Sequence, residues 1–272
     1  GQTAPGDGIC LQNRGLGVTY THDVVIRYLR IRPGKQGTKE FDSMGVVNSH
    51  NIIFDHCSFS WGNDEVCSLV VSSSTRLDRV TLQWCIISEG LDWYDHSMGF
   101  AVDSKDGAVT LHHNLFAHNG TRNPRVGAWP GHSIDADVRN NVFYNWRDWC
   151  GYGGTPKEGT ININYVGNYL KAGPSTKKKT SRTAFLSGGN TTSIYGRGNK
   201  FHRHSDISDE DMINVQRYGG RLLAKPITVA KVETDAAKVA YRRVLASAGA
   251  VLPVRDAVDT RIVKQVKNGR GK

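Results

Sequence analysis

The chain has little cysteine and no long hydrophobic run. Its five cysteines, spread over 272 residues, form no C-x-x-C pair. That argues against a zinc ribbon and against a small fold stapled by disulfides. One or two disulfides are possible if the protein is exported, and otherwise the thiols serve as small buried apolar side chains. No apolar stretch approaches the roughly 18 residues that a membrane-spanning helix needs, and a coiled coil or a disordered tail fits the composition poorly.

Acidic residues are fewer than basic ones. The 35 Lys and Arg against 25 Asp and Glu give a formal charge of +10 and a sequence pI of about 9.4. Such a chain favours an acidic partner, which can be a nucleic acid, an anionic membrane surface or a polyanionic polysaccharide. The basic residues are scattered rather than gathered in an arm, which weakens the case for nucleic acid.

A strand-like unit recurs every 27 to 31 residues. One position per repeat fixes the register: Leu29, Cys57, Cys85, Asn114, Asn141, Asn168 and Asn199. The residue two places later is always apolar: Ile31, Phe59, Ile87, Phe116, Phe143, Leu170 and Phe201. So is the residue five places earlier: Val24, Ile52, Val80, Val109, Ala136, Ile163 and Ile194. The positions three before the register are also apolar or aromatic in six of seven repeats, and this alternation is typical of a strand.

Repeats of this kind, with Gly, Asn and Ser between them and no amphipathic helix, predict an all-β solenoid of parallel strands over about residues 20–205. Each coil then buries its apolar face by stacking on its neighbours. Asn occupies the register position in the last four repeats. These side chains are expected to form a ladder of hydrogen bonds from coil to coil, which is a structural role.

The C-terminal part changes character. Helical spacing of apolar residues over 234–248, behind a possible cap at Thr234, and again up to Asn268 and Gly269, predicts helices within about 234–268. They are expected to lie over an end or flank of the solenoid, so that residues 1–272 form a single domain.

Acidic residues occur on two successive coils. Asp42 stands one coil before Asp64 and Glu65. Stacked strands can bring such carboxylates within about 5 Å of one another, where they repel unless a cation lies among them. Oxygen ligands favour Ca²⁺, although acids in solvated turns would show the same spacing.

Two other clusters can carry chemistry. Arg122 and Arg125 flank Pro124, and two guanidinium groups so placed can bind the carboxylates of an acidic substrate. The pairs Asp55-His56 and His112-His113 follow strands, where histidines are usually structural but can also bind metal or transfer protons.

These motifs resemble pectate lyase family 1. The run NIIFDHCSFSWGNDE from residue 51 resembles its first signature, and VTLHHNLFAHNGTRNPRV with DVRNNVFYNW resembles its second. The first six residues, and LASAGAVLPVRDAVDTRIV near the end, look like the bacterial branch. The resemblance covers nearly the whole chain and implies a right-handed parallel β-helix, which agrees with the repeat.

The resemblance implies a role for each matching residue. Arg122 would be the Brønsted base, and Arg125, His96 and His113 would bind substrate. The Ca²⁺ ligands would come from Asp42, Asp64 and position 68, where this chain has Ser68 instead of a carboxylate, so that Glu65 can substitute.

Two further positions depart from the family pattern. Gly127 stands where another Arg is usual, and Met98 stands in the place of a substrate-binding Lys, two residues after His96. These departures imply a changed subsite, weaker calcium binding or lost activity.

The predicted function is that of a secreted, monomeric, Ca²⁺-dependent lyase that cleaves polygalacturonate by β-elimination and leaves 4,5-unsaturated oligogalacturonides, with no nucleic-acid or membrane partner. A guanidinium normally keeps its proton, with a pKa above about 12. The resemblance implies that Ca²⁺ and Arg125 lower that pKa and that activity rises at alkaline pH. A lyase for another acidic glycan, a hydrolase with paired catalytic acids and a non-catalytic polysaccharide-binding protein stay open.

Overall fold

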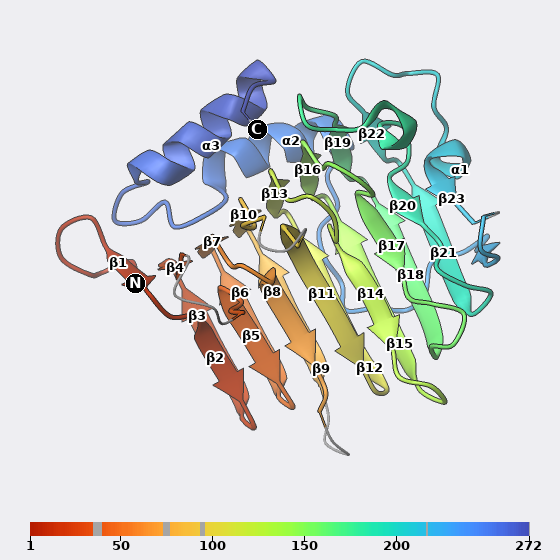
Figure 1. The fold of residues 1–272 in the computed structure, drawn as a ribbon, viewed down its shortest axis with the longest axis horizontal. Helices are drawn as coiled ribbons and strands as arrows, with labels where there is room; N and C mark the ends of the chain where they lie inside the picture. The colour runs from red at the N-terminus through yellow and green to blue at the C-terminus, as the bar shows by residue number, and fades with distance from the viewer. Residues whose placement is uncertain (35–39, 73–76, 93–95, 216, 272) are drawn as a thin grey trace.

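Three parallel sheets form the body of the molecule (Figure 1). The structure is a computed structural model that describes residues 1–34, 40–72, 77–92, 96–215 and 217–271. Within these ranges each sheet contains eight strands, and successive strands of the chain pass from one sheet to the next. The predicted right-handed parallel β-helix is confirmed.

The strands are named by sheet. Sheet A contains β1 (Ile9–Gln12), β4 (Leu29–Arg32), β7 (Ser58–Ser60), β10 (Ile86–Ser88), β13 (Leu115–Ala117), β16 (Val142–Tyr144), β19 (Tyr169–Lys171) and β22 (Lys200–Phe201). Sheet B contains β2 (Leu16–Thr19), β5 (Met44–Val47), β8 (Glu65–Val70), β11 (Met98–Ser104), β14 (Arg125–Ala128), β17 (Gly151–Gly153), β20 (Phe185–Leu186) and β23 (Ile213–Asn214). Sheet C contains β3 (His22–Arg27), β6 (His50–Asp55), β9 (Asp78–Gln83), β12 (Gly107–His112), β15 (Ser133–Arg139), β18 (Thr160–Val166), β21 (Thr192–Arg197) and β24 (Arg221–Leu222).

The two apolar columns of the repeat are the inner faces of two sheets. The residues five before the register pair from strand to strand along sheet C, as Val80 does with Val109, and those two after it pair along sheet A, as Phe116 does with Phe143. Both columns belong to one buried core. The strands extend beyond the predicted range of 20–205, from Ile9 to Leu222, because the outermost coils keep the strand pairing while losing parts of the apolar columns.

The asparagine ladder is present. The Asn114 amide nitrogen donates to Asn141 Oδ1 at 3.0 Å, Asn141 donates in the same way to Asn168, and Asn168 to Asn199, both at 2.9 Å. Cys85 extends the ladder by donating its backbone N–H to Asn114 Oδ1 at 2.8 Å. Each bond satisfies a buried backbone donor where the chain turns from sheet C to sheet A.

A left-handed bend precedes every rung. The residue just before the register position has a φ between 53° and 70° in all seven repeats: Tyr28, His56, Trp84, His113, Asn140, Gly167 and Gly198. Glycine adopts this conformation without strain, whereas aromatic side chains rarely do. Four of the rings stack along the corner, with centroids 5.0, 5.9 and 4.3 Å apart.

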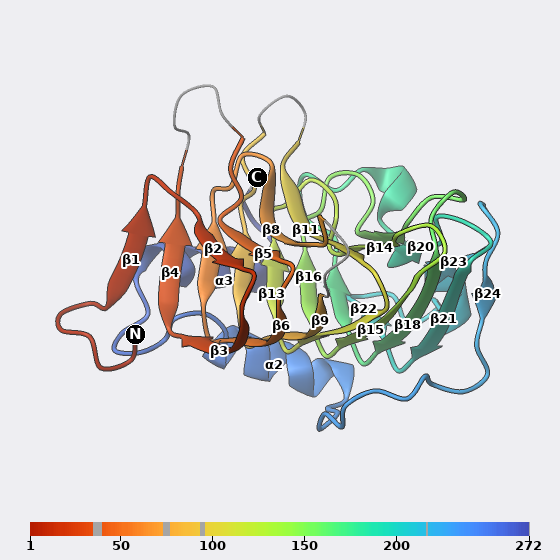
Figure 2. The same cartoon turned by 90° about the horizontal axis from the view of Figure 1, so that it is seen from below.

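Two helices cover the outside of sheet A. They are α2 (Ala237–Ser247) and α3 (Ala257–Asn268), and the shorter turns are η1 (Lys178–Thr180) and α1 (Asp209–Met212). A second apolar cluster joins the helices to the sheet, with Val244 and Ile262 packed over Leu115 and Val142. Figure 2 shows the chain returning from β24 along the solenoid to α2.

The predicted cap at Thr234 is wrong. Helix α2 begins after Ala236, which makes no side-chain cap, and Thr234 Oγ1 instead accepts a hydrogen bond from Arg139 at 2.8 Å. The Thr234 hydroxyl is therefore bound to Arg139 of sheet C and does not cap the helix. The predicted end of α3 is confirmed, since Gly269 ends it with a φ of 67°.

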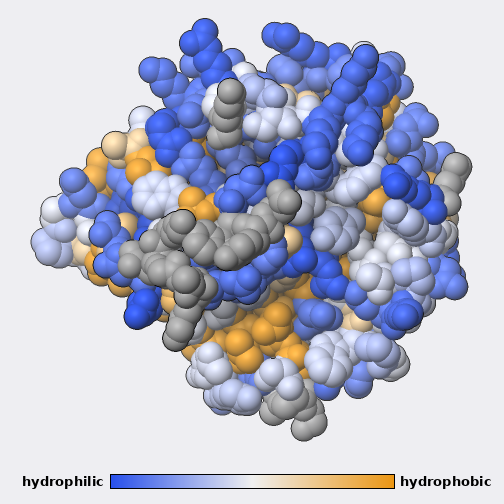
Figure 3. Space-filling model, viewed as in Figure 1, coloured by the Kyte–Doolittle hydropathy of each residue, from blue (hydrophilic) through white to orange (hydrophobic). Residues whose placement is uncertain are grey.

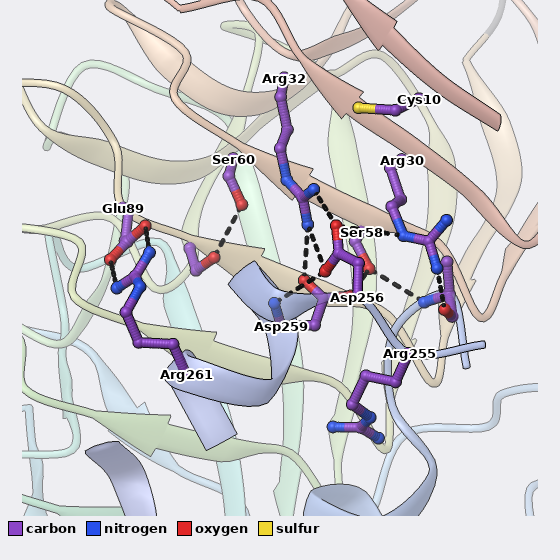
Figure 4. A network of polar contacts seen from close by, with 12 residues as sticks. Cys10, Arg30, Arg32, Ser58, Ser60, Glu89, Arg255, Asp256, Asp259 and Arg261 are labelled. Atoms are coloured by element: carbon purple, nitrogen blue, oxygen red, sulfur yellow. Dashed lines mark hydrogen bonds and ion pairs between the residues drawn. The ribbon is translucent and has the colours of Figure 1, made fainter. Parts of the chain in front are cut away.

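A buried polar network fixes α3 to the first coils (Figure 4). Arg32 on β4 donates to Asp259 at 2.9 Å and forms an ion pair with Asp256, the residue that caps the helix. Ser58 on β7 donates to Asp259 at 2.5 Å and accepts from the Ala250 amide nitrogen at 2.9 Å. We call Arg32, Ser58, Asp256 and Asp259 the helix clamp.

All five cysteines are free, and four of them are buried. The interpretation as small buried apolar side chains therefore holds for these four, whereas Cys10 is exposed. In the ranges that the structure describes, none of the helices is long and apolar enough to span a bilayer.

Candidate active site

Three carboxylates gather where the chain enters sheet B. Asp42 precedes β5, and Asp64 and Glu65 stand at the start of β8 one coil later. Their oxygens can lie within 4.8 Å of one another. Asn63 aligns the two coils, because its amide nitrogen donates to Phe41 O at 2.9 Å. The grouping predicted from stacked coils is present, and we call Asp42, Asp64 and Glu65 the acid cluster.

Ser68 lies beside this cluster. Its hydroxyl donates to one carboxylate oxygen of Asp42, while the Glu65 amide nitrogen donates to the other at 3.1 Å. Ser68 thus orients Asp42 rather than adding a carboxylate. Glu65 supplies the third acid.

Burial and mutual repulsion disfavour ionisation of the cluster. Burial raises the pKa of Asp42 to about 6, although the hydrogen bond from Ser68 opposes this. Burial likewise raises the pKa of Glu65 to about 7, with Arg122 opposing and the two aspartates adding to the rise. Three carboxylates face one guanidinium, so a bound cation would reduce the repulsion between them.

Arg122 reaches the cluster from two coils away. Its guanidinium forms an ion pair with Glu65 and donates from Nε to the Tyr152 hydroxyl at 3.2 Å. Its backbone is left-handed, with a φ of 57°, and its carbonyl accepts from the Phe100 amide nitrogen at 2.6 Å. Burial lowers the pKa of Arg122, but Tyr152 and Glu65 outweigh it, so the pKa lies above its ordinary value.

His96 and Met98 lie at the edge of the same cluster. His96 Nδ1 is 2.8 Å from Asp64 Oδ1, and both side chains are nearly one-third exposed. Met98 pairs with Glu65 in the sheet and bridges to Thr121, so an uncharged side chain stands between the acid cluster and the Arg122 coil.

Arg125 is held by two acids. It donates to Glu158 Oε1 at 2.6 Å, and its Nη1 lies 3.9 Å from Asp103 Oδ2. Gly127 and Gly154 make room for this, because an added Cβ would lie 2.7 Å and 1.9 Å from Glu158 Oε2. The guanidinium is therefore engaged within the protein rather than open to a ligand.

The structure does not bring His113 to this site. His113 is only 3% exposed, stacks on Trp84 and lies 3.1 Å from Asp235 on the segment before α2. It occupies the corner between sheets C and A, away from the sheet B strands that carry the acid cluster. Its contacts are those of a structural residue.

Comparison with known proteins gives consistent relatives. The chain is 36% identical to "Probable pectate lyase C" of Aspergillus flavus over 276 residues, which are 98% of this chain and 61% of that protein. The protein of the same name from Neosartorya fischeri is also 36% identical, again over 98% of this chain and 61% of the relative. The chain is similar to these probable pectate lyases over nearly all of its own length. It spans about three fifths of the length of these curated relatives.

Pectate lyases of known structure have the same fold. A pectate lyase bound to hexasaccharide superposes with a TM-score of 0.60 at 13% identity, covering 90% of this chain and 65% of that one. Pectate lyase C from Erwinia chrysanthemi, in a structure with Ca²⁺, gives a TM-score of 0.52 at 17% identity, covering 95% and 79%. No family model matches the chain.

Three residues were not expected at the site. Tyr152 could have been found from the repeat, because it stands 27 residues after Arg125 and pairs with it on the next strand. Asp103 pairs with Gly127 in the same way. Glu158 lies in a loop outside the repeat, where spacing carries no signal.

Proposed function

We propose that the chain is a Ca²⁺-dependent lyase that cleaves polygalacturonate by β-elimination and releases 4,5-unsaturated oligogalacturonides. The observation that carries the proposal is the acid cluster beside Arg122, in a chain similar to probable pectate lyases. The curated relatives are named for that activity, and because this chain spans about three fifths of them, we extend the activity to it as a proposal.

The acid cluster fits a calcium ion. Asp42, Asp64 and Glu65 offer hard oxygen donors, and repulsion between them adds to the rise that burial causes in the pKa of Asp42 and Glu65. Bound there, Ca²⁺ would stabilise the charge that develops on the carboxylate of the substrate. Ser68 would keep Asp42 oriented for this purpose.

Arg122 would remove the proton from C5 of the sugar whose C4 carries the glycosidic oxygen. The C–H electron pair then forms the C4–C5 double bond, and the C4–O bond breaks as the glycosidic oxygen departs. The ion pair with Glu65 keeps Arg122 charged, so Arg122 must part from Glu65 before it can act as a base. Removal of a proton from the guanidinium also becomes easier as the pH rises.

The polymer would lie along the solenoid on the outer face of sheet B. Small side chains follow one another there at paired positions, Gly45 beside Ser68 and Ser68 beside Ala101, and the same row continues to Arg125. This row gives a flat floor between the acid cluster and Arg125. His96 and Arg125 would bind uronate carboxylates, the latter once Glu158 releases it.

We also propose that the protein is secreted, acts as a monomer and engages neither nucleic acid nor membrane. An extracellular plant polysaccharide is reached only by an exported enzyme. The sheet B face of one solenoid would bind the polymer without a second copy.

The test is the ultraviolet absorbance of 4,5-unsaturated products on polygalacturonate, with and without a calcium chelator. Calcium-dependent absorbance is expected, and Arg122→Ala should reduce it by about 10²- to 10⁴-fold, as loss of a general base does. Arg79→Ala, which removes a half-exposed Arg on sheet C, is the matched control and should retain activity.

Each other result identifies an alternative. Saturated products would indicate a hydrolase, and binding without any cleavage would indicate a non-catalytic polysaccharide-binding protein. Activity confined to a different polyuronate would change the substrate but keep the mechanism. Full activity in Arg122→Ala would remove Arg122 from the reaction.

A further inference from the structure

The surplus of positive charge does not come from the part of the chain that carries the acid cluster. Residues 1–169 contain 14 Lys and Arg against 17 Asp and Glu, whereas residues 170–272 contain 21 against 8. The first segment, which carries the candidate active site, is therefore slightly negative, and the last carries the whole surplus of +13. The net positive charge, which favours an acidic partner, therefore comes from a part of the chain other than the one that carries the candidate active site.

Two adjoining cavities lie where this surplus gathers. One is about 460 Å³ and lies among Lys200, His204 and Lys238, beside the start of α2. The other is also about 460 Å³ and lies among Lys171, Arg203 and Lys267, between β19, β22 and the end of α3. His204 lines both, so the two cavities form one groove, which we call the basic groove. No described residue lining either cavity is acidic.

The cations of the basic groove are not neutralised by the protein. In the described ranges, the side chains of Lys200, Arg203, Lys238 and Lys267 form no ion pair. Two acids lie beside the groove and are engaged elsewhere. Asp206 is held by Arg182 at 2.6 Å and lies 3.7 Å from His204, and Asp209 accepts from the backbone amides of Gly198 and Asn199 at 2.7 and 2.9 Å. Figure 3 shows long hydrophilic side chains along the upper edge of the molecule, where Figure 1 places α2, α3 and β22.

The groups in the groove influence one another. Burial lowers the pKa of Lys171, and the nearby charge of Arg203 lowers it further. Burial, Lys171 and Arg203 together lower the pKa of His202. Lys171 is fixed in position, because its ammonium donates to the carbonyls of Val266 and Lys267 at 2.6 and 3.1 Å. A fixed ammonium among unpaired cations is the arrangement that favours an anion.

We propose that the basic groove is a second binding site for an acidic polysaccharide, separate from the candidate active site. It lies on the helix-covered side of sheet A, whereas the acid cluster opens on sheet B. Its elongated form and its several unpaired cations suit a linear polyanion better than a single small anion. Tyr241 lines the groove and can pack against a sugar ring.

The choice of polyuronate rests on the proposed function. A polymer held in the basic groove keeps its other segments near sheet B, and this raises their effective concentration at the candidate active site. A short oligomer cannot reach both places. The basic groove should therefore matter for polymers and not for trimers.

The experiment compares two triple variants of the full chain with equal net charge. The first removes charges from the basic groove: Lys200→Gln, Arg203→Asn and Lys267→Gln. The control removes exposed charges elsewhere in the same segment: Arg197→Gln, Lys225→Gln and Lys231→Gln. Asn is used at position 203 because it tolerates the left-handed φ of 61°. Polygalacturonate binding is measured in chelator by affinity electrophoresis at several salt concentrations.

The groove variant should bind polygalacturonate about tenfold more weakly and with a shallower salt dependence, and the control should change little. Cleavage of trigalacturonate should be equal in both. Equal loss of binding in the two variants would overturn the proposal, since net charge alone would explain it. Displacement of the polymer by millimolar inorganic phosphate would indicate a small-anion site, and tighter binding of single-stranded DNA of equal charge would indicate a nucleic-acid site; either would also overturn it.

Binding is measured without turnover, so the two proposals can fail separately. A protein that never forms unsaturated product can still show groove-dependent binding. A working lyase whose two triple variants bind alike would lose only the basic groove.

Discussion

Two clusters of arginine and carboxylate, one at sheet A and one at the start of sheet B, differ in their balance of charge. The helix clamp sets the buried Arg32, with Arg30 beside it, against Asp256 and Asp259. The acid cluster sets three carboxylates against one guanidinium, that of Arg122, with His96 beside Asp64. Charges that match within the protein hold a helix in place, whereas an unmatched surplus indicates a place for an ion from outside.

The pKa values follow this difference. Burial opposes ionisation of Asp256, but the hydrogen bond from Arg32 outweighs it and the pKa lies below its usual value. Asp42 accepts no hydrogen bond from an arginine, and burial raises its pKa to about 6. Asp259 is the exception in the clamp, because complete burial raises its pKa in spite of Arg32. The pKa of each carboxyl group therefore depends both on its hydrogen-bond partners and on its burial.

The largest effect is expected from breaking the balanced cluster. Arg32→Ala would leave the buried Asp259 without its guanidinium and Asp256 with Arg30 only, which typically costs about 3–5 kcal/mol. The measurement is the free energy of unfolding from urea titration. Arg182→Ala removes an ion pair with Asp206 that is exposed on both sides and worth at most about 1 kcal/mol, and it serves as the control. Similar losses in the two variants would mean that the helix clamp does not hold α3.

The next effect concerns pH and the acid cluster. Folding raises the pKa of Asp42 and Glu65, so the folded protein keeps protons that the unfolded chain releases between about pH 4 and pH 7. The contribution to stability is therefore complete below about pH 4 and is lost as the pH rises to about 7. In chelator, this loss should be at most about 3 kcal/mol for each of the two carboxyl groups.

The comparison variant for this loss is the double substitution Asp42→Asn with Glu65→Gln. It should have a flatter pH profile of unfolding than the parent chain. Calcium at pH 8 should restore stability to the parent chain alone, since a ligand that binds only the folded state stabilises it. Identical pH profiles in the two proteins would contradict the raised pKa values.

Adding a fourth acid should sharpen the contrast. Ser68→Asp places another carboxylate next to Asp42, which should destabilise the calcium-free protein by about 1–2 kcal/mol at pH 8 through repulsion. The same change should tighten Ca²⁺ binding about tenfold by adding a ligand, as measured by calorimetry. Ser68→Ala is the control and should weaken binding, because Asp42 loses its hydroxyl donor. If Ser68→Asp bound Ca²⁺ no more tightly than the parent chain, this result would argue against a calcium site.

The smallest effect is expected at Arg125. Glu158→Gln removes one charge that neutralises this guanidinium, so KM for polygalacturonate should fall about threefold while kcat changes little. Initial rates over a range of substrate concentrations test this. Lys157→Gln, at the neighbouring position, is the control. A rise in KM would show that Glu158 helps to bind substrate.

The fold could be predicted because the repeat constrains it. Every coil must bury the residues around Phe59, Phe116 and their equivalents against the coils above and below, so one spacing recurs along the chain. The ladder followed from Asn114 and its successors by the same logic. The start of α2 could not be predicted, because Thr234 is used by Arg139 on a strand 95 residues earlier.

The site divides in the same way. Asp42, Asp64 and Glu65 were expected together because they lie on successive coils. The pairing of Glu65 with Arg122 spans two coils and depends on the length of the arginine side chain, and the capture of Arg125 by Glu158 depends on a loop with no repeat. His113 carried a family signature yet faces a buried stack, since a motif records a position in the chain and not the direction of a side chain.

Because the same left-handed bend precedes each rung, successive coils are equivalent to one another at this corner. Asn114 and Asn141 stand at the same point of successive turns, with the same backbone angle before each and the same bond to the next rung. A cut after any rung and a join after the next would remove one turn while leaving the strands on either side in register. The molecule can therefore lengthen or shorten by whole turns in evolution, and the distance between its two charged surfaces can change in steps of one strand spacing.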